Sequence, residues 1–481
     1  MRRDQAGLVA GAAALFAVVF LARLTTLTMF AAGPSFHQLQ REDFFDKSKH
    51  FPKSKQKKPL PPWEAGFFDI HHIRAGSSES TLFRLPDGTS LLVDAGEIPD
   101  GWVDKYGGTL TVDGPAPGFK SSGAQIVDYV THFVEGPLDY IVVTHFHSDH
   151  MSAVPYVADR VDFGLLLDRG YPGYDFPGPV KQLGFDDYKA FVDGLPEGKV
   201  QQIQLGDTSQ IRCCEEETTP DGGGGLRRPN RPSFRTRVLK RGLTWATAGD
   251  LYEAADVLDA AKGSWDENKL SIALAFDYGD FSYYEGGDNQ HVEYSELLLL
   301  RRGDDKDQDE EHRVDTTTPT AKAAGAVDVA TLNHHSHGVN AAFFRALQPK
   351  VAILQGWCSD QPTNDALYLL TSPALPVLDG SRDRVLFATN IQREAFASAG
   401  PRVEKFQSTH GHVVVRVYPP KSSAGSDDGL LDDNNAKTSS PRRDATYYKV
   451  FILDNDLRVI AEHGPFEAFA KKHRTQQPPS S

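Results

Sequence analysis

Histidine and aspartate side chains crowd into one short stretch of the chain. Residues 144–151 are THFHSDHM, which places His145, His147, Asp149 and His150 within six positions. Imidazole nitrogens and carboxylate oxygens are the ligands that borderline cations such as zinc bind in proteins. Side chains two apart in extended backbone point the same way, so His145 and His147 can reach one cation. Asp149 and His150 come after the extended part and suit a second cation.

A buried strand is predicted to position this cluster. Residues 138–143, LDYIVV, form a short apolar and β-branched run directly before it, a pattern typical of a buried strand. Residues 81–85 and 91–93 predict two earlier strands joined by a turn at 86–88. Near the other end, strands are predicted at 412–417, 447–453 and 458–460, and we expect these three to pair as a terminal sheet element.

Three further segments complete a recognisable pattern. Residues 91–96 are LLVDAG, residues 283–288 are YYEGGD, and residues 333–338 are NHHSHG. With the H-x-H-x-D-H run at 145–150, and in this order, the chain resembles the metallo-β-lactamase-fold hydrolases from about residue 67 to about residue 357. The resemblance implies an α/β (α+β) fold, a four-layer αββα sandwich whose strand ends deliver the ligands to one edge of the β-layers.

The same resemblance implies a centre for two divalent metal ions. Zinc is expected for these ligands, and manganese or iron also fits a carboxylate-rich site. The implied ligands are His145 and His147 for the first cation, Asp149, His150 and His335 for the second, and Asp288 as a bridge.

Other residues are expected to support the chemistry. Asp94 would accept a hydrogen bond from a ligand imidazole and fix its tautomer. His334 and His337 compete with His335 for the ligand role, and whichever is free would contact the substrate or protonate a leaving group. Asp149, His334 and His337 are therefore the candidate catalytic residues.

The chain departs from the family pattern at one position. Many two-metal members carry another histidine ligand between the first cluster and the bridging aspartate, but no histidine occurs here between His150 and His291. Asp168, at the end of the apolar run 165–167, could fill the gap, or it is an ordinary acid at a strand end.

Within the family, the chain is most similar to the hydrolase domain of DNA-uptake competence proteins (ComEC-like). Residues 69–76 (DIHHIRAG), residues 268–274 (NKLSIAL) and the double histidine before Gly338 carry this resemblance. These segments indicate the branch better than they indicate a substrate.

The expected reaction is hydrolysis by a metal-bound hydroxide, since cations lower the pKa of bound water to near neutrality. A phosphoester or phosphodiester is the first substrate hypothesis. A carbonyl substrate (a lactone, thioester or β-lactam) is the second, because the same two cations serve both reactions. A non-catalytic metal-binding protein is the third.

Composition limits the partners. The net charge is −14, which disfavours tight nonspecific binding to nucleic acid because phosphates repel an acidic protein. The expected partner is a small-molecule or phosphoester substrate. Three cysteines, with Cys213 and Cys214 adjacent and Cys358 apart, exclude a disulfide framework, and the adjacent pair is a weak zinc candidate.

The N-terminus carries a targeting segment. Arg2 and Arg3 precede an apolar stretch over residues 6–22, which predicts a signal peptide or an uncleaved signal anchor. The basic flank favours export to the secretory pathway, with the catalytic part secreted or anchored to a membrane on its non-cytoplasmic side. The expected organisation is a signal segment (1–32), a polar basic tether (33–62), one hydrolase domain (63–465) with inserted loops near 220–241, 301–318 and 419–444, and a polar tail (466–481).

Overall fold

The computed structural model describes residues 57–176, 178–214, 232–246, 251–253, 266–290, 315–420 and 445–470. The predicted signal segment, most of the tether, and residues 220–231, 301–314 and 421–444 of the predicted insertions lie outside these residues. Within them, no helix is both long enough and apolar enough to span a membrane.

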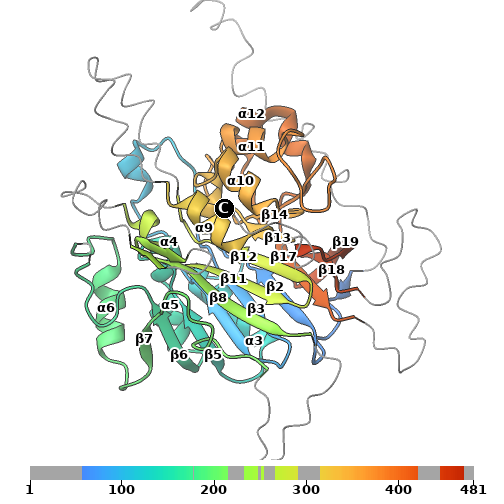
Figure 1. Ribbon diagram of the computed structural model, residues 1–481. Coiled ribbons are helices and arrows are strands. Elements are labelled where there is room, and N and C mark those ends of the chain that lie inside the picture. Colours follow the sequence, from blue (N-terminus) through green and yellow to red (C-terminus); the bar gives the residue numbers. More distant parts are fainter. Residues whose placement is uncertain are drawn as a thin grey trace, which may run out of the picture. The chain divides into compact units, whose positions relative to one another are not determined.

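Two mixed sheets form the centre of the molecule (Figure 1). The first has the strand order β1-β19-β18-β17-β2-β3-β4-β5-β6-β7, in which β4 to β7 are parallel. Its strands are β1 (Lys58–Pro59), β2 (Phe68–His72), β3 (Thr81–Arg84), β4 (Ser90–Val93), β5 (Leu138–Val142), β6 (Phe163–Asp168), β7 (Val200–Gln202), β17 (His412–Tyr418), β18 (Tyr447–Leu453) and β19 (Arg458–Glu467).

The second sheet has the strand order β10-β9-β8-β11-β12-β13-β14-β15-β16, with β12 to β16 parallel. Its strands are β8 (Phe234–Arg241), β9 (Thr244–Ala246), β10 (Leu251–Glu253), β11 (Ala273–Tyr278), β12 (Phe281–Glu285), β13 (Val329–Thr331), β14 (Val351–Leu354), β15 (Val385–Ala388) and β16 (Phe406–Ser408).

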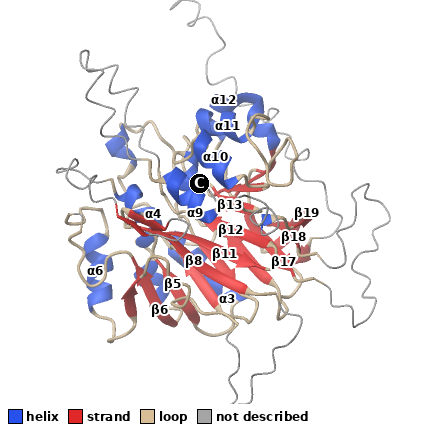
Figure 2. Cartoon of the chain, viewed as in Figure 1, coloured by secondary structure: helices blue, strands red, loops and turns tan. Residues whose placement is uncertain are grey.

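Helices cover the outer faces of both sheets (Figure 2). The first sheet packs against α3 (Ser122–Phe133), α4 (Ser148–Met151), α5 (Val154–Ala158) and α6 (Phe185–Asp193). The second packs against α9 (Thr317–Ala324), α10 (Ala341–Leu347), α11 (Asn364–Leu370) and α12 (Arg393–Ala399). Short 3-10 helices are η3 (Val103–Tyr106), η4 (Glu267–Leu270), η6 (Asn333–Ser336) and η7 (Gly400–Lys405).

A shared apolar core joins the two sheets. Phe68 and Phe83 of the first sheet pack against Phe276 and Tyr283 of the second, and the rings of Phe83 and Phe276 stack with centroids 4.6 Å apart. Separate apolar clusters lie between each sheet and its own helices. The layers therefore run α, β, β, α, which confirms the predicted four-layer sandwich.

The predicted terminal sheet element is confirmed. β17 pairs antiparallel with β18 and also with β2, and β18 pairs with β19. A buried ion pair fixes this junction, because Nε and Nη2 of Arg416 donate to Asp69 at 2.8 and 2.6 Å. The C-terminal strands β17 to β19 thereby extend the sheet that contains the N-terminal strand β2.

Three predicted boundaries are wrong. Residues 234–241, predicted to belong to an inserted loop, form β8, because its alternate positions Thr236, Val238 and Lys240 are buried and Nζ of Lys240 donates to the backbone oxygens of Lys269 and Ser271. Residues 58–60 of the predicted tether belong to the fold through β1. The predicted polar tail begins too early, since β19 continues to Glu467 and buried residues follow it.

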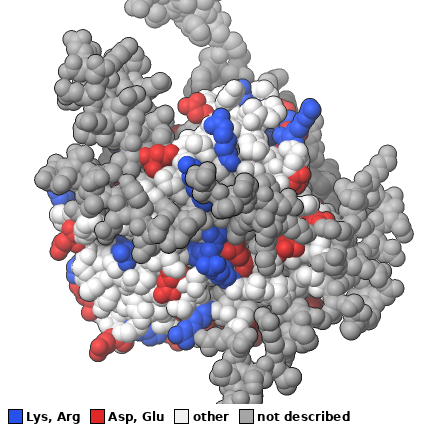
Figure 3. Space-filling model, in the orientation of Figure 1, with Lys and Arg blue, Asp and Glu red and all other residues white. Residues whose placement is uncertain are grey.

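The direction of the parallel strands indicates at which edge of the sheets a ligand site should lie. The parallel strands β4 and β5 end at one edge of their sheet, as do β12 and β13 of the other. Ligand sites in such sheets form beyond the carboxyl ends of the strands. Over the face drawn in Figure 3, Lys and Arg side chains are interspersed with Asp and Glu among the described residues.

Candidate metal centre

The segment after β5 carries the first ligand candidates. Backbone hydrogen bonds from Val143 to β6 and from Ile272 to Thr144 hold it between the two sheets. His147 is extended, with φ −75° and ψ 153°, and caps the helix α4. His145 and His147 thus precede the helical turn, and Asp149 and His150 lie on it, which is the division that the sequence predicted.

A glycine allows the loop after β4 to touch this turn. Ala95 donates to the backbone oxygen of His150 at 2.8 Å, and Glu97 donates to that of Ser148 at 2.9 Å. A Cβ atom added to Gly96 would lie 1.8 Å from the carbonyl carbon of Asp149. Only glycine therefore permits this approach, and the approach sets the position of α4.

Asp94 orients His150. Its carboxylate accepts hydrogen bonds from the backbone N–H and the hydroxyl of Thr144 at 2.7 and 2.6 Å, and it lies 2.7 Å from Nδ1 of His150. A proton on Nδ1 leaves the lone pair of Nε2 free to bind a cation. The structure places Asp94 against Nδ1 of His150, and its supporting role stays a prediction.

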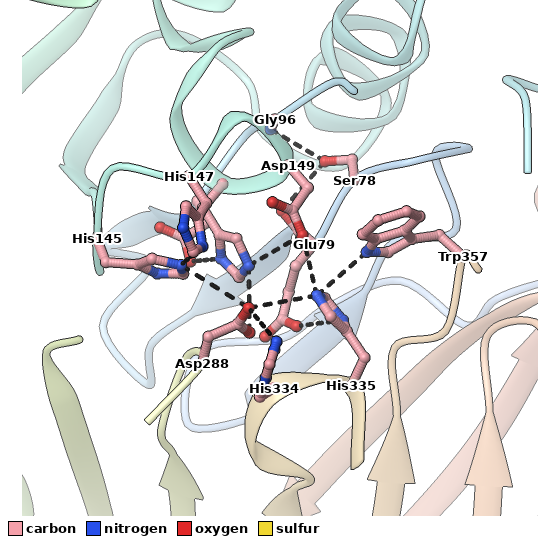
Figure 4. A network of polar contacts seen from close by, with 12 residues as sticks. Ser78, Glu79, Gly96, His145, His147, Asp149, Asp288, His334, His335 and Trp357 are labelled. Atoms are coloured by element: carbon pink, nitrogen blue, oxygen red, sulfur yellow. Dashed lines mark hydrogen bonds and ion pairs between the residues drawn. The ribbon is translucent and has the colours of Figure 1, made fainter. Parts of the chain in front are cut away.

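Two groups of ligand atoms meet at Asp288 (Figure 4). One contains His145 and His147, with Nε2 of His145 3.2 Å from Nδ1 of His147 and 3.7 Å from Oδ2 of Asp288. The other contains His150 and His335, whose Nε2 atoms lie 3.2 Å from Oδ1 and 3.6 Å from Oδ2 of Asp288. The two oxygens of one carboxylate therefore face both groups.

Asp149 lies beside the second group, whose fourth member is Glu79. Its Oδ2 lies 3.0 Å from Nε2 of His335 and 3.4 Å from Nε2 of His150. The predicted second-cation ligands Asp149, His150 and His335 are thus brought together, along with the predicted bridging residue.

Glu79 belongs to the site, although the sequence did not point to it. It is buried, and its Oε2 lies 3.1 Å from Nδ1 of His335, which also contacts the backbone oxygen of Gln355 at 2.8 Å. Its backbone N–H donates to the backbone oxygen of Asp149. Glu79 sits in a serine-rich loop between β2 and β3 with no fixed spacing from the histidine cluster, so sequence spacing carried no signal for it.

Unsatisfied atoms indicate that the residues fit a cation. Nε2 of His150 and Oδ1 of Asp288 are buried, and neither makes a hydrogen bond within the described part of the chain. Buried polar atoms almost always have partners. A divalent ion accepts electron pairs from both kinds of atom, so the donor set suits one.

The electrostatics point the same way. Burial disfavours charge on His150, yet Asp288, Asp149 and Asp94 raise its pKa well above the ordinary value. Burial likewise opposes charge on Asp288, but His150 and the other facing histidines hold its pKa well below the usual range. The buried carboxylates therefore favour positive charge in the centre. Protons on the histidines supply that charge when no cation is bound, and a divalent ion would supply it when bound.

His145 has the opposite tendency. Burial and the neighbouring His150 hold its pKa well below the ordinary value. A neutral imidazole is the form that binds metal ions, so His145 is preset as a ligand.

Asp168 has a different role from the one considered for the missing histidine. Its carboxylate accepts hydrogen bonds from the backbone N–H groups of Gly170 and Tyr171 and from the hydroxyls of Tyr174 and Tyr188, all within 2.9 Å. Among the described residues it joins no group of potential metal ligands. It is a structural acid at the end of β6.

Other candidates lie apart from the centre. Nε2 of His337 faces Asp360 at 3.6 Å, and its role as an acid stays a prediction. Cys213 and Cys214 group with Asp87 at the turn between β3 and β4, outside both histidine groups.

One family model matches part of the chain. Residues 73–210 match the family model of the Metallo-beta-lactamase superfamily. A search of curated protein sequences finds no match to the chain.

Several solved structures are similar to parts of the chain. CmlA, a diiron beta-hydroxylase from Streptomyces venezuelae, is 14% identical with a TM-score of 0.31, over 62% of this chain and 45% of that one. A proposed metal-dependent hydrolase from Parabacteroides distasonis is 11% identical with a TM-score of 0.30, over 67% and 96% of the two chains. A metallo-beta-lactamase from Cronobacter sakazakii is 12% identical with a TM-score of 0.25, over 57% and 78%. This chain thus spans less than half the length of CmlA.

The match of residues 73–210 places the histidine cluster within a segment that is similar to the Metallo-beta-lactamase superfamily. The αββα layers and the two groups of potential ligands are what a metal-dependent hydrolase of that fold requires.

Proposed function

We propose that this protein hydrolyses a phosphoester, most favourably a phosphodiester, at a centre of two divalent cations. The observation that carries the proposal is the sharing of Asp288 between two groups of ligand atoms. Two cations held this way stabilise both the attacking and the leaving oxygen of an in-line displacement at phosphorus. The ligand set favours zinc, and its carboxylates also suit manganese or iron.

The chain's own residues would divide the work as follows. His145, His147 and Asp288 would hold the first cation. Asp288, His150 and His335 would hold the second, with Asp149 and Glu79 as the carboxylates beside them. Bound divalent cations would supply the Lewis acidity that ionises a water near neutral pH.

Supporting residues keep the ligand nitrogens facing inward. Asp94 contacts Nδ1 of His150 from the side away from Asp288. Nδ1 of His335 contacts the backbone oxygen of Gln355 at 2.8 Å and the Glu79 carboxylate at 3.1 Å. Trp357 is buried beside Trp102, and its indole nitrogen lies 3.1 Å from Nε2 of His335. This N–H donates to Nε2 of His335 and so lies at the edge of the second ligand group.

The branch resemblance supports the choice of phosphoester. The segments at 69–76 and 268–274 and the double histidine before Gly338 are similar to those of the competence-protein hydrolase domain. In this structure these segments border the centre, since Asn268 and His334 contact each other and Glu79 follows the first segment.

Substrate choice tests the proposal. The full-length protein is expected to hydrolyse bis(p-nitrophenyl) phosphate and to be inhibited by inorganic phosphate. Asp149→Ala and Asp288→Asn are each expected to lower kcat/KM by about 10³-fold or more, because both remove groups that hold the cations. Asp168→Asn, a buried acid outside the centre, is the matched control and should retain most of the activity.

The alternative substrate class gives a clear contrary result. Turnover of a lactone, a thioester or nitrocefin without phosphodiester turnover would replace the proposal with carbonyl hydrolysis. Activity that survives in Asp288→Asn would contradict the shared-cation centre itself.

We further propose that the catalytic part acts in the secretory pathway or beyond it, on a small-molecule or phosphoester substrate. The basic and apolar N-terminal segment supports this, although it lies outside the described residues. A protease-protection assay on membrane vesicles tests the proposal. Protection of the catalytic part inside the vesicle lumen is expected, and digestion from the cytoplasmic side would contradict it.

A further inference from the structure

A buried ion pair contacts the segment that carries the first ligand candidates. Nε and Nη2 of Arg169 donate to the two carboxylate oxygens of Glu267, both at 2.8 Å, and the two side chains are 3% and 5% exposed. Two parallel hydrogen bonds between a guanidinium and a carboxylate fix the relative position of both groups. Such a pair adds little net stability, because removing both charges from water costs about as much as their attraction returns. Its further contacts therefore indicate its role.

The pair holds the residue that lies between two ligand candidates. Oε1 of Glu267 accepts a hydrogen bond from the backbone N–H of Phe146 at 3.1 Å, and Phe146 lies between His145 and His147 in the sequence. The guanidinium carbon of Arg169 lies 4.5 Å from the centre of the Phe146 ring, which is fully buried. The carboxylate thus contacts the backbone of this residue, and the guanidinium contacts its side chain.

This stretch of backbone depends on a side-chain acceptor. The hydrogen bonds that join the preceding segment to the sheets extend to Thr144, whose backbone oxygen accepts from Ile272. Among the described residues, neither His145 nor Phe146 takes part in a hydrogen bond between two backbone groups. A buried N–H without an acceptor is costly. The Glu267 carboxylate therefore fixes the backbone where the sheet no longer does and α4 has not yet begun.

Each partner of the pair is held by its own part of the fold. Arg169 follows β6 of the first sheet, and its Nη1 donates to the backbone oxygen of Phe176 at 3.2 Å. Glu267 belongs to η4, which precedes β11 of the second sheet. The buried Lys240 of β8 donates to two backbone oxygens at the end of η4 and directly after it. The ion pair therefore joins the two sheets beside the histidine segment.

The helix η4 also borders the centre directly. The side-chain amide nitrogen of Asn268, the residue after Glu267, lies 3.0 Å from Nε2 of His334. That nitrogen of His334 lies 3.8 Å from Oδ2 of Asp288. A displacement of η4 would therefore change the contacts of the centre on the side of Asp288 as well as at Phe146.

We infer that Glu267 and Arg169 are positioning residues for the first ligand group. Glu267 fixes the backbone between His145 and His147, and Arg169 fixes Glu267. Within the described part of the chain, neither belongs to a group of potential metal ligands, so both act through Phe146. The inference rests on the first cation site of the proposed function, but it does not depend on the substrate.

A matched pair of double variants tests the inference. Arg169→Met/Glu267→Gln and Arg169→Met/Glu267→Met each remove both charges together, which avoids leaving one buried charge without its partner. They differ at one group, because the glutamine amide oxygen can still accept from the N–H of Phe146, whereas the methionine thioether is a weak acceptor. The double variant Arg416→Met/Asp69→Leu removes a buried ion pair outside both ligand groups and is the control.

Cation binding is the readout, independently of turnover. The metal-free full-length protein and its variants would be titrated with Co²⁺, and binding would be followed by calorimetry and by the visible spectrum. Urea unfolding would show that each variant is folded. Glu267→Asp is a further variant that keeps the charge but shortens the side chain, and it guards against a folding failure of the double variants.

The expected results separate the two cation sites. The wild-type protein and the control should bind two Co²⁺ ions per chain with the same spectrum. Arg169→Met/Glu267→Met should weaken one of the two sites about 10–100-fold, the range for residues that orient a ligand, and should shift the part of the spectrum that belongs to that site. Glu267→Asp should weaken the same site, and Arg169→Met/Glu267→Gln should recover most of the loss.

Two results would overturn the inference. One is wild-type Co²⁺ affinity and spectrum in both Arg169→Met/Glu267→Met and Glu267→Asp. The other is an equal loss in the two double variants, because the hydrogen bond to Phe146 would then have no effect. Failure of the proposed substrate is a separate result: a protein that shows the expected Co²⁺ losses but cleaves no phosphodiester keeps the positioning role and rejects the substrate.

Discussion

Cation binding requires that each histidine direct an unprotonated ring nitrogen toward Asp288. Asp94 contacts Nδ1 of His150, and Glu79 contacts Nδ1 of His335, which leaves both Nε2 atoms directed at Asp288. Residues that orient ligands in this way typically change metal affinity by 10–100-fold when replaced. The acids outside the immediate ligand set are therefore expected to matter nearly as much as the ligands.

Asp94→Asn tests this expectation. The amide offers one acceptor oxygen where the carboxylate receives three contacts, from Thr144 twice and from His150. We expect cation affinity to fall about 10–100-fold, measured by titration of the metal-free protein. Asp168→Asn is the control, because it also removes a buried carboxylate and should cost about 1–3 kcal/mol of stability with unchanged cation affinity. Equal cation affinity in Asp94→Asn and wild type would contradict the orienting role.

Glu285 predicts a pH dependence of stability. Burial and the neighbouring Glu79 raise the pKa of Glu285 to about 8 in the folded protein, whereas an unfolded glutamate titrates near about 4.3. Between these values the folded state keeps a proton that the unfolded state has lost. The stabilising contribution is therefore complete below the unfolded pKa and is lost as the pH rises through the folded pKa.

Glu285→Gln should remove this dependence. Relative to the variant, the wild-type free energy of unfolding should fall steadily from pH 5 to pH 8 and level off above that. Urea unfolding in the presence of EDTA measures it, with the exposed Glu404→Gln as control. A difference between wild type and Glu285→Gln that does not change with pH would show that Glu285 is ionised in the folded state.

Sequence reasoning identified the candidate ligands that share a motif and missed the residues that only the fold brings together. His145, His147, Asp149 and His150 follow one strand, so local spacing predicted them. Glu79 and Asn268 reach the centre from loops about 70 and 120 residues away in the sequence. No local pattern marks Glu79, and the segment 268–274 indicated a branch of the family but no contact for Asn268. Their contacts with His335 and His334 exist only after the sheets pack.

At the level of elements, the centre depends on how closely the loop after β4 approaches α4. Two backbone hydrogen bonds join them beside Gly96, where no Cβ atom fits. Displacing α4 would move Asp149 and His150 away from Asp288.

Gly96→Ala tests that contact. The added methyl would overlap the backbone of Asp149, so we expect a loss of more than about 4 kcal/mol, the range of severe core damage, together with weakened cation binding. Urea unfolding and cation titration measure both. Gly173→Ala, at a glycine whose Cβ would meet nothing within 4 Å, should leave both unchanged. If Gly96→Ala were as stable as the wild type, the loop would have space for a Cβ atom at this position, and the close contact with α4 would not require glycine.

The hydrophobic pattern of the sequence predicted the apolar strands but missed one charged strand. The strands β3, β4, β5 and β18 are apolar runs, and the sequence predicted them. β8 was missed because its residues are strongly basic, yet Lys240 is buried through hydrogen bonds to two backbone oxygens and Arg237 pairs with Asp277. Tertiary partners that neutralise a charged strand cannot be found from the local pattern.

For the whole molecule, the C-terminal strands stabilise the sheet that carries the site. β17 joins β2, and the buried Arg416 and Asp69 face each other across this junction. Arg416 also donates to the backbone oxygens of Pro61 and Pro62, which ties in the start of the described chain.

Arg416→Met should therefore destabilise the whole unit. Removing one partner of a buried ion pair costs about 3–5 kcal/mol, because the other charge is left without compensation. The double variant Arg416→Met/Asp69→Leu should recover much of that loss in urea unfolding. A single variant as stable as the wild type would show that the pair is not needed at the junction.

The central claim is that Asp288 is shared by two cations, and counting cations tests it most directly. Metal content per chain would be measured by mass spectrometry of the purified full-length protein and of Asp288→Asn, after loading with Zn²⁺ and removal of excess. We predict two ions per wild-type chain and fewer than one per Asp288→Asn chain, since both sites lose a common ligand. One ion or none in the wild type, or two ions retained in Asp288→Asn, would contradict the shared centre.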